Sequence, residues 1–313
     1  MNVVFSVAFP LFALIATGFV AGRVRLLGRD GSGALNVFVT WFALPALLFN
    51  AIASVRLSEV LNLPFIAAFG LTIVIVYGVG MLMARLASGA GLAQMSLHGL
   101  TAAYGNVGYI GIPLCLYALG PQGAVPAAAA TCLGSAFLLT FAVVLIESDL
   151  QAGRGLWRTT RRVLVAVARS PVLIAIVAGG IVSALGIKLP VPIQRFLELI
   201  GAAAAPCALF AIGLFLSHTS IRANLREVGL ATISKVLLQP LVALSIVPWF
   251  LPLDSVWAQA ALLMATLPTA SNAFVLAKQY DVFVEETSTT VLLSTLLSVF
   301  TVSAMLVWLR GGF

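Results

Sequence analysis

The sequence predicts an all-α polytopic membrane protein with ten transmembrane helices, arranged as two inverted five-helix repeats. Three observations predict this fold: a mostly apolar composition, apolar segments of membrane-spanning length, and matching helix-breaking motifs in both halves of the chain. Of the 313 residues, 61% are hydrophobic and only 9% are charged, and the mean hydropathy is +1.12. A water-soluble domain of this length does not need so large an apolar fraction, so lipid must surround most of the side chains.

Ten apolar segments are long enough to span a bilayer. A spanning helix needs roughly 20 apolar residues, because the hydrocarbon core is about 30 Å thick and each residue rises about 1.5 Å. The ten segments cover residues 3–22, 34–53, 64–86, 96–118, 125–147, 171–188, 196–217, 229–251, 258–279 and 287–309. The first basic residue, Arg23, lies beyond the first segment, so we expect no cleavable signal peptide.

Basic residues are concentrated on one predicted side of the membrane. Loops after odd-numbered segments carry twelve of them: Arg23, Arg25, Arg29, Arg85, Arg154, Arg158, Arg161, Arg162, Arg169, Arg222, Arg226 and Lys278. The opposite side carries four: Arg56, Lys188, Arg195 and Arg310. Because short basic loops stay in the cytoplasm, both termini are expected outside it, in the inner membrane of a cell. We interpret the basic stretch 151–170 as a cytoplasmic connector at the anionic lipid surface and not as a nucleic-acid site.

The two halves of the chain resemble each other at a constant offset. Pro206 follows Pro45 by 161 positions, Asn272 follows Asn106 by 166, and the eighth segment begins 165 positions after the third. The offset relates residues 1–150 to residues 171–313. Since each repeat would hold five helices, an odd number, the second copy enters the membrane from the opposite side, which makes an inverted repeat.

The fourth and ninth segments are each interrupted where a membrane helix should be continuous. Residues 104–113 read YGNVGYIGIP, and residues 267–274 read LPTASNAF. Proline removes a backbone hydrogen bond, and glycine uncovers the backbone. Unpaired backbone groups survive at membrane depth only where protein, water or ligand satisfies them. Two broken helices that cross would bring half-helix ends together near the bilayer centre, where the N-terminal ends suit a carboxylate.

These motifs define the candidate site. The predicted substrate-binding residues are Asn106, Gly108, Tyr109, Pro113, Pro268, Ser271, Asn272 and Asn50. Lys235 and Gln239, one helical turn apart, are candidates for a counter-charge and its polar support, although Lys235 is near enough to a span end to snorkel to the surface. The alternative for the broken segments is kinked packing helices whose asparagines bond to neighbouring backbone, and Asn50 can equally be a helix–helix contact.

The remaining polar residues favour neither catalysis nor a cofactor. His98 and His218 lie close to predicted membrane edges, where we interpret them as structural residues, with a proton relay as the alternative. Glu147, Glu198, Glu285 and Glu286 lie near segment ends, so an intramembrane carboxylate for a coupling cation is not expected. The three cysteines have no paired spacing and are interpreted as small apolar residues. The motifs of intramembrane proteases are absent, and neither a metal nor a cofactor is predicted.

The motif Asn106-x-x-x-x-Gly111-Ile112-Pro113-Leu114, with Pro268 and the stretch 274–280 (FVLAKQY), resembles the auxin efflux carrier family over essentially the whole chain, including residues 44–49 (LPALLF). The resemblance implies ten spans in two inverted repeats, with helices four and nine crossing at prolines. It further implies that Asn106, Pro113 and Pro268 bind the substrate carboxylate or shape its site. Plant members carry a long loop between spans five and six, so the short connector here is similar to bacterial members, which often move malonate or related carboxylates.

The resulting prediction is a secondary transporter, not an enzyme, that moves a small organic anion by elevator-type alternating access. Spans three to five and eight to ten would form a mobile unit, and the other four a scaffold, for which a homodimer is one compatible assembly. Two alternatives stay open: a sodium-coupled organic-anion symporter of the bile-acid type, and a membrane sensor that binds a ligand without moving it. Apart from the lipid bilayer and the anion, no partner is predicted.

Overall fold

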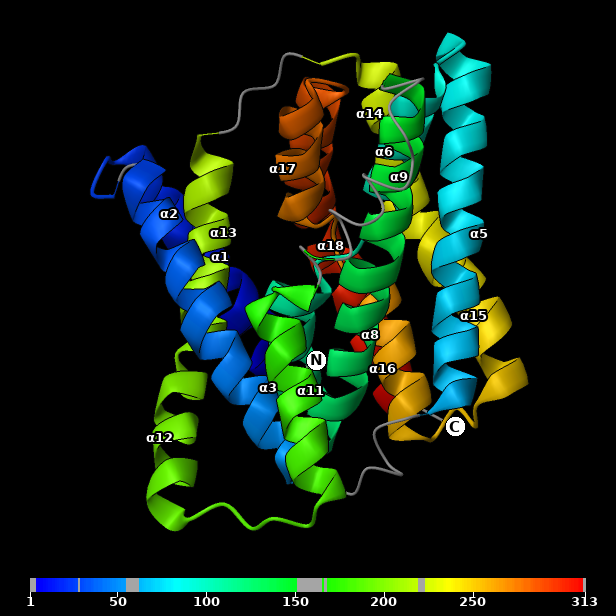
Figure 1. The fold of residues 1–313 in the computed structure, drawn as a ribbon. Coiled ribbons are helices and arrows are strands. Elements are labelled where there is room, and N and C mark those ends of the chain that lie inside the picture. Colours follow the sequence, from blue (N-terminus) through cyan, green and yellow to red (C-terminus); the bar gives the residue numbers. More distant parts are fainter. Residues whose placement is uncertain are drawn as a thin grey trace. The chain divides into compact units, whose positions relative to one another are not determined.

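The computed structural model describes residues 4–27, 29–54, 62–150, 165, 168–218 and 223–311. Within these residues the secondary structure is helical, apart from one isolated β-bridge (Figure 1). Most of the predicted connector 151–170 lies outside the described residues, as do the predicted loop arginines Arg56, Arg154, Arg158, Arg161, Arg162 and Arg222.

Seven helical segments are long and apolar enough to cross a membrane. They are Ser6–Arg23, Gly31–Ala53, Leu63–Ser88, Pro121–Leu150, Val191–Ser217, Leu225–Phe250 and Val284–Gly311. Three shorter apolar helices accompany them: Val107–Leu119, Pro171–Ala184 and Val256–Ala265. Two of the shorter ones belong to the predicted fourth and ninth segments, and the third begins at Pro171, as the sixth segment does. The chain is therefore a multi-pass helical membrane protein.

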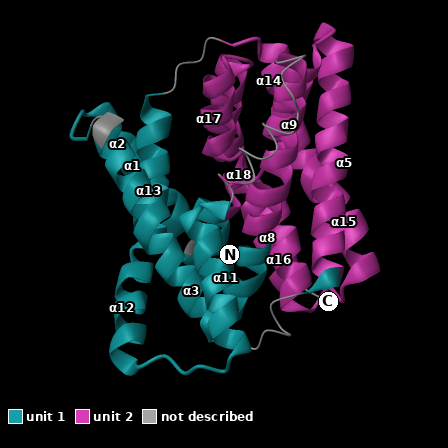
Figure 2. Cartoon of the chain, in the orientation of Figure 1, with its two compact units in different colours: residues 1–63, 108–129, 168–218 teal, residues 64–107, 130–167, 219–313 magenta. Residues whose placement is uncertain are grey.

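The chain divides into two compact units, each assembled from separate stretches of sequence (Figure 2). Unit 1 comprises residues 1–63, 108–129 and 168–218, and unit 2 comprises residues 64–107, 130–167 and 219–313. Two of the boundaries pass through the interior of a helical element, η3 (Val107–Gly111) and α8 (Ala124–Cys132), and a third follows Leu63, the first residue of α5 (Leu63–Ser88). Each unit is described below by itself.

Unit 1 is built on two helix pairs that approach closely. Its further helices are η1 (Val4–Ala8), α1 (Phe9–Arg23), α2 (Arg29–Phe38), η2 (Val39–Ala43), α3 (Leu44–Ala53), α7 (Ile112–Leu119), η4 (Pro121–Gly123), α11 (Pro171–Ala184), α12 (Val191–Ala202) and α13 (Ala204–Ser217). Helix α1 packs on α13, and α3 packs on α11. Glycine makes both contacts possible, because a Cβ on Gly213 would lie 2.0 Å from the Ile15 carbonyl oxygen, and one on Gly179 would lie 2.9 Å from that of Phe49.

Unit 2 contains the longest helices and both helix breaks. Its further elements are α5 (Leu63–Ser88), α6 (Leu92–Ala103), η5 (Leu133–Leu138), α9 (Leu139–Leu150), α14 (Leu225–Ile233), η6 (Ser234–Leu238), α15 (Gln239–Phe250), α16 (Val256–Ala265), α17 (Ser271–Tyr280) and α18 (Val284–Gly311). Helix α6 packs on α9, and α18 contacts both α14 and α17. The unit therefore encloses α6 and the break that follows it.

Four of the described π-helical turns have a common cause in the sequence. The turns η1, η2, η3 and η6 each lead directly into an α-helix whose second residue is proline: Pro10, Pro45, Pro113 and Pro240. A proline ring clashes with the carbonyl four residues earlier and offers no N–H to it. A π-turn widens the helix at that place, so the chain continues without the missing hydrogen bond.

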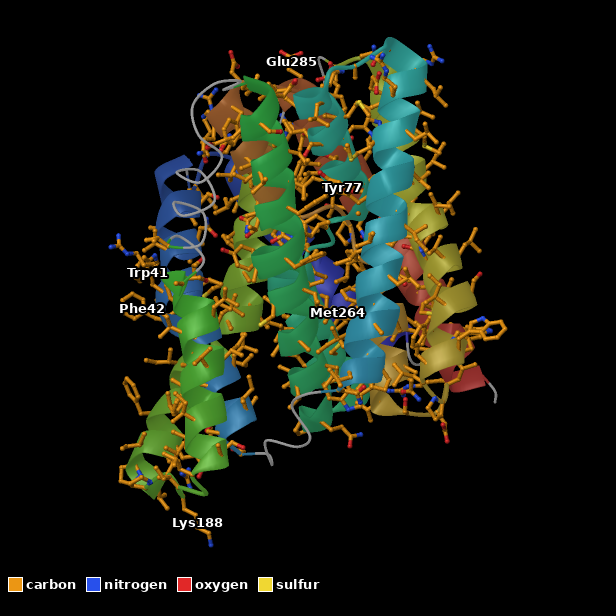
Figure 3. All side chains as sticks on the ribbon, turned by 45° about the vertical axis from the view of Figure 1, so that its right-hand side comes forward. Trp41, Phe42, Tyr77, Lys188, Met264 and Glu285 are labelled. Atoms are coloured by element: carbon orange, nitrogen blue, oxygen red, sulfur yellow. The ribbon has the colours of Figure 1, made fainter. Side chains whose placement is uncertain are left out.

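Large apolar side chains cover the outer surface, as expected for helices in lipid. Trp41 and Phe42, which Figure 3 labels, have exposed fractions of 58% and 57%, and Trp249 reaches 87%. In water such a surface would drive association. In a bilayer it is the side of the helix that lipid tails solvate.

Candidate functional site

Both predicted helix breaks are present in unit 2. Helix α6 ends at Ala103, and helical structure resumes at Val107. Helix α16 ends at Ala265, and α17 begins at Ser271. Pro268 has no N–H to continue a helical ladder, and the backbone at Ala270 is extended (φ −69°, ψ 136°). The local chemistry of the two motifs therefore does interrupt the helices where the sequence predicts.

The two breaks hydrogen-bond to each other through their backbones. Asn106 N donates to the Pro268 carbonyl oxygen at 2.9 Å, and Ala270 N donates to the Tyr104 carbonyl oxygen at 2.9 Å. Gly105 and Thr269 form an antiparallel β-bridge between them. Backbone groups that the helices leave unpaired are thus satisfied by the other break, which is what a membrane-buried interruption requires.

Side chains complete this pairing at the carbonyl end of α6. Thr269 Oγ1 donates to the Thr101 carbonyl oxygen at 2.8 Å, and Gln239 Nε2 donates to that of Ala103 at 3.0 Å. Ser294 Oγ accepts from Thr269 N at 3.1 Å. All of these groups are buried. Gln239 therefore satisfies a carbonyl group at the end of α6.

Lys235 lies inside this cluster, so the interpretation that it snorkels to the surface is wrong. Its exposed fraction is 0%, and Nζ donates to Gln239 Oε1. A Cβ added to Gly105 would lie 3.3 Å from Nζ and 3.4 Å from the Met264 carbonyl oxygen. The ammonium group therefore lies directly against the break, where the glycine leaves room for it. The C-terminal end of α6 carries partial negative charge, which favours a cation beside it.

The opposite kind of helix end lies at the second break, where α17 begins. The N-terminus of α17 is preceded by Ala270, which provides no side-chain cap. Ser271 is half-buried, Asn272 is exposed, and Asn106 is 6% exposed. The Tyr104 hydroxyl is hydrogen-bonded to Ser135 Oγ at 3.2 Å and interacts with the Asn272 side chain. Helix N–H groups and amide side chains are the groups with which a protein binds a carboxylate.

The other predicted binding residues belong to unit 1. The Tyr109 hydroxyl is hydrogen-bonded to Thr40 Oγ1 at 2.7 Å and donates to Asn36 Oδ1. Pro113 is the buried second residue of α7, and a Cβ on Gly108 would meet nothing within 4 Å. Asn50, on α3, is half-buried, and its Oδ1 has no hydrogen-bond partner among the described residues. Unit 2 thus brings together Asn106, Pro268, Ser271, Asn272, Lys235 and Gln239, whereas unit 1 holds Gly108, Tyr109, Pro113 and Asn50.

A buried ion pair elsewhere in unit 2 was missed by the sequence reasoning. His98 Nε2 lies 3.4 Å from Glu227 Oε2, and the exposed fractions of the two side chains are 0% and 3%. His98 is therefore buried inside unit 2 against a carboxylate, a contact that the interpretation as a membrane-edge residue did not include. The sequence around Glu227 was ambiguous. Glu227 is three residues after the N-cap Asn224, and this spacing is typical of a capping box, in which the carboxylate lies at the surface of the helix.

The described residues offer no cluster for a metal ion. Within them, no three His, Cys, Asp or Glu side chains lie close enough together to hold one. Cys115, Cys132 and Cys207 are free thiols, the first buried and the other two half-buried. The polar groups described above for unit 2 are therefore helix termini, amide and hydroxyl side chains, the Lys235 ammonium group and the His98–Glu227 pair.

Comparison with known proteins identifies the family. The sequence model of the membrane transport protein family matches residues 3–306. A protein of Rhizobium meliloti described as "Putative malonate transporter" is 34% identical over 97% of this chain and 95% of its own length. An uncharacterized transporter of Methanothermobacter thermautotrophicus is 27% identical over 92% of both chains, and the uncharacterized transporter YfdV of Escherichia coli is 25% identical over 88% of this chain and 87% of its own. All three are described as transporters and not as enzymes. The chain therefore belongs to the membrane transport protein family, the family of the auxin efflux carriers.

Proposed function

We propose that the protein is a secondary transporter that moves a small organic anion, such as malonate or another carboxylate, across the cytoplasmic membrane. The observation that carries the proposal is the paired helix break in unit 2. It combines the uncapped N-terminus of α17 with the buried Lys235 ammonium group. The description of the Rhizobium relative supports the substrate class.

The carboxylate would bind at the positive end of α17. Backbone N–H groups of its first turn, together with the Ser271 hydroxyl and the Asn272 amide, would donate hydrogen bonds to the anion. Asn106 would reach the same place from the other break, since its backbone N is bonded to the Pro268 carbonyl oxygen. Lys235 would act as a counter-charge beside the break. It would not be a direct ligand, because its Nζ already donates to Gln239.

Ten spans in two inverted repeats account for the packing within unit 1. In the predicted order of spans, α1 and α11 are the first helices of the two repeats, and α3 and α13 are the second ones. The observed pairs, α1 with α13 and α3 with α11, each join the first helix of one repeat to the second helix of the other. An inverted repeat generates such equivalent pairs by its twofold axis.

Transport would proceed by an elevator-type movement of unit 2, which carries the paired breaks, relative to unit 1 as the scaffold. The division of the chain supports this assignment, since spans one, two, six and seven belong to unit 1, and spans three and eight to ten belong to unit 2. Spans four and five are each divided, because the unit boundaries fall after Val107 and after Ala129. We further propose that two copies associate through their scaffold units. The protein would lie in the inner membrane with both termini outside the cytoplasm.

Malonate counterflow in liposomes tests the function. The purified wild-type protein should exchange external labelled malonate for internal malonate. Unlabelled mono- and dicarboxylates that bind the same site should lower this exchange. Asn272→Ala and Asn106→Ala should each lower the exchange about tenfold or more, as expected for the loss of a hydrogen bond to a charged group. Gln194→Ala, at an exposed position of α12, is the matched control.

Two outcomes would contradict the proposal. One is the absence of exchange with every carboxylate of the panel, and the other is exchange that survives both asparagine substitutions unchanged. A sodium gradient imposed on the same liposomes separates this carrier from a sodium-coupled symporter, whose uptake would rise with the gradient.

A further inference from the structure

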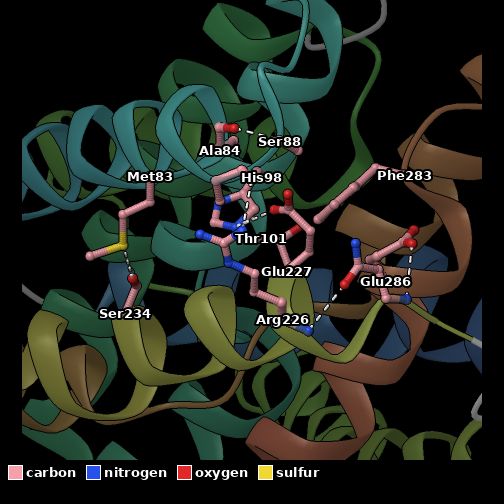
Figure 4. A network of polar contacts seen from close by, with 12 residues as sticks. Met83, Ala84, Ser88, His98, Thr101, Arg226, Glu227, Ser234, Phe283 and Glu286 are labelled. Carbon is pink, nitrogen blue, oxygen red and sulfur yellow. Dashed lines mark hydrogen bonds and ion pairs between the residues drawn. The ribbon is translucent and has the colours of Figure 1, made fainter.

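The His98–Glu227 ion pair is the most enclosed acid–base pair described in unit 2. His98 lies on α6 and Glu227 on α14, and Figure 4 shows their side chains facing each other. The Phe283 ring lies against the imidazole, with ring centroids 5.4 Å apart, and is itself 8% exposed. Charged groups are costly inside a membrane protein and are retained there mostly for ion or proton pathways.

The other titratable groups on the surrounding helices have partners of their own. Arg226 donates to the Ala87 carbonyl oxygen at 3.0 Å, and Glu286 accepts from Asn224 N at 3.3 Å. Tyr77 is bonded to Ser96, Arg85 to the Gly89 carbonyl oxygen, Glu147 to Tyr280, Asp149 to Ala93 N, and Lys235 to Gln239. Lys278 and Glu285 are exposed. The imidazole and the Glu227 carboxylate are thus each other's ionisable partner.

A shared proton decides whether this pair carries a net charge. With one proton the pair is neutral overall, and without it one negative charge stays buried. An unpaired buried charge is far costlier than a paired one, so loss of the proton favours any arrangement in which water reaches the pair. Proton occupancy and conformation are therefore linked at this place.

Helix α6 connects the pair to the paired helix breaks. His98 is five residues before the end of α6 at Ala103, which corresponds to about 7.5 Å along the axis. One turn after His98, the Thr101 carbonyl oxygen accepts from Thr269 Oγ1 at 2.8 Å, in the second break. The Thr101 hydroxyl is also bonded to Thr287 of α18 at 3.3 Å. A displacement of α6 against α14 would thus be transmitted to both breaks.

From this arrangement we propose that His98 and Glu227 form a proton-binding site that couples anion transport to proton movement. The inference rests on the proposed transport function, because coupling requires a transported anion. One proton would bind the pair on one side of the membrane and leave it on the other, without any change in covalent bonds. The coupling ion would then be a proton, held away from the anion site.

Proton-coupled accumulation in liposomes tests this inference separately from transport itself. Counterflow at equal pH reports exchange, whereas net malonate uptake under a pH gradient, with the membrane potential clamped at zero, reports coupling. At one proton per malonate, one pH unit should sustain about a tenfold concentration ratio. A pH-sensitive dye inside wild-type liposomes should report malonate-dependent proton movement.

The variants His98→Gln and Glu227→Gln should retain counterflow within about threefold of wild type and lose the accumulation under the pH gradient. His218→Gln and Glu285→Gln are the matched controls and should keep it, because neither residue belongs to the pair. Wild-type exchange without any dye signal would overturn the inference while leaving the proposed function intact. Variants that keep the gradient response, or that lose exchange and accumulation in parallel, would overturn it too, the latter by showing a structural role. Absence of exchange in the wild type would instead overturn the proposed function.

Discussion

At the scale of single residues, a glycine leaves room for an ammonium group in the candidate site. Gly105 has no side chain, and Lys235 Nζ would lie 3.3 Å from a Cβ placed there. Alanine at this position would press on the flexible end of the lysine and on the Met264 carbonyl oxygen, 3.4 Å away. Added methyl groups in a tightly packed interior cost about 1–3 kcal/mol.

We therefore predict that Gly105→Ala lowers malonate counterflow about fivefold to tenfold, while the protein remains folded, because the counter-charge is displaced. Gly70→Ala, in α5 of the same unit, is the matched control, since its Cβ would meet nothing within 4 Å. Initial exchange rates of the two variants, at equal amounts of reconstituted protein, decide the point. Equal rates for both variants would show that the position of Lys235 does not matter for transport.

Sequence reasoning could find the glycine but not its neighbour. The motifs around Gly105 and Pro268 act on their own backbone, so the helix breaks could be predicted from local chemistry. The burial of Lys235 depends on Gly105 and Gln239, and the pairing of Gln239 with Ala103 joins residues 136 positions apart. His98 and Glu227 are likewise far apart in the sequence, and a histidine in the middle of a helix gives no local sign of its partner. Contacts between residues so far apart in the sequence are formed by tertiary packing, which local motifs do not reveal.

At the scale of helices, glycine determines how closely α1 and α13 approach. A Cβ on Gly213 would lie 2.0 Å from the Ile15 carbonyl oxygen, and one on Gly18 would lie 2.1 Å from that of Phe210. Both clashes involve backbone, which cannot move aside as a flexible side chain can. Helix association in membranes depends on such small residues, because the hydrophobic effect does not drive it there.

Gly213→Ala should therefore destabilise the folded protein by about 1–3 kcal/mol and lower its melting temperature in detergent by several degrees. The control is Gly33→Ala in α2 of the same unit, where a Cβ would meet nothing within 4 Å. Thermal unfolding of the detergent-solubilised variants measures the difference. A Gly213→Ala protein as stable as the control would mean that α1 and α13 are not held in close contact.

The predicted helices also show what the sequence pattern could not decide. Hydropathy predicts a span over residues 196–217, but the structure ends α12 at Ala202 and begins α13 at Ala204, so that helical structure starts at Val191. Pro206 marks this interruption, because its ring would clash with the carbonyl four residues earlier, that of Ala202. The proline-linked π-turns were likewise not predicted, although Pro10, Pro45, Pro113 and Pro240 mark them. A proline in the sequence indicates that the helix is disturbed there. Whether the helix ends or continues through a π-turn depends on the packing of the residues that follow.

At the scale of the whole molecule, an even number of spans places both ends of the chain on one side of the membrane. With ten spans and the basic loops in the cytoplasm, both termini are predicted outside it. Reporter enzymes that are active only outside the cytoplasm, fused to either end, should both be active. A reporter fused in the connector after Leu150 is the control and should be inactive. Opposite results for the two termini would exclude ten spans.

The central claim is that the paired breaks of unit 2 bind a carboxylate by helix-end dipoles and amides. Equilibrium binding of labelled malonate to the purified protein tests this most directly, because it needs neither coupling nor movement. The account predicts saturable binding that Asn272→Ala weakens about tenfold or more and Gln194→Ala leaves unchanged, with no comparable binding of the uncharged diamide. Binding that is equally strong for the diamide, or unaffected by Asn272→Ala and Asn106→Ala, would contradict it.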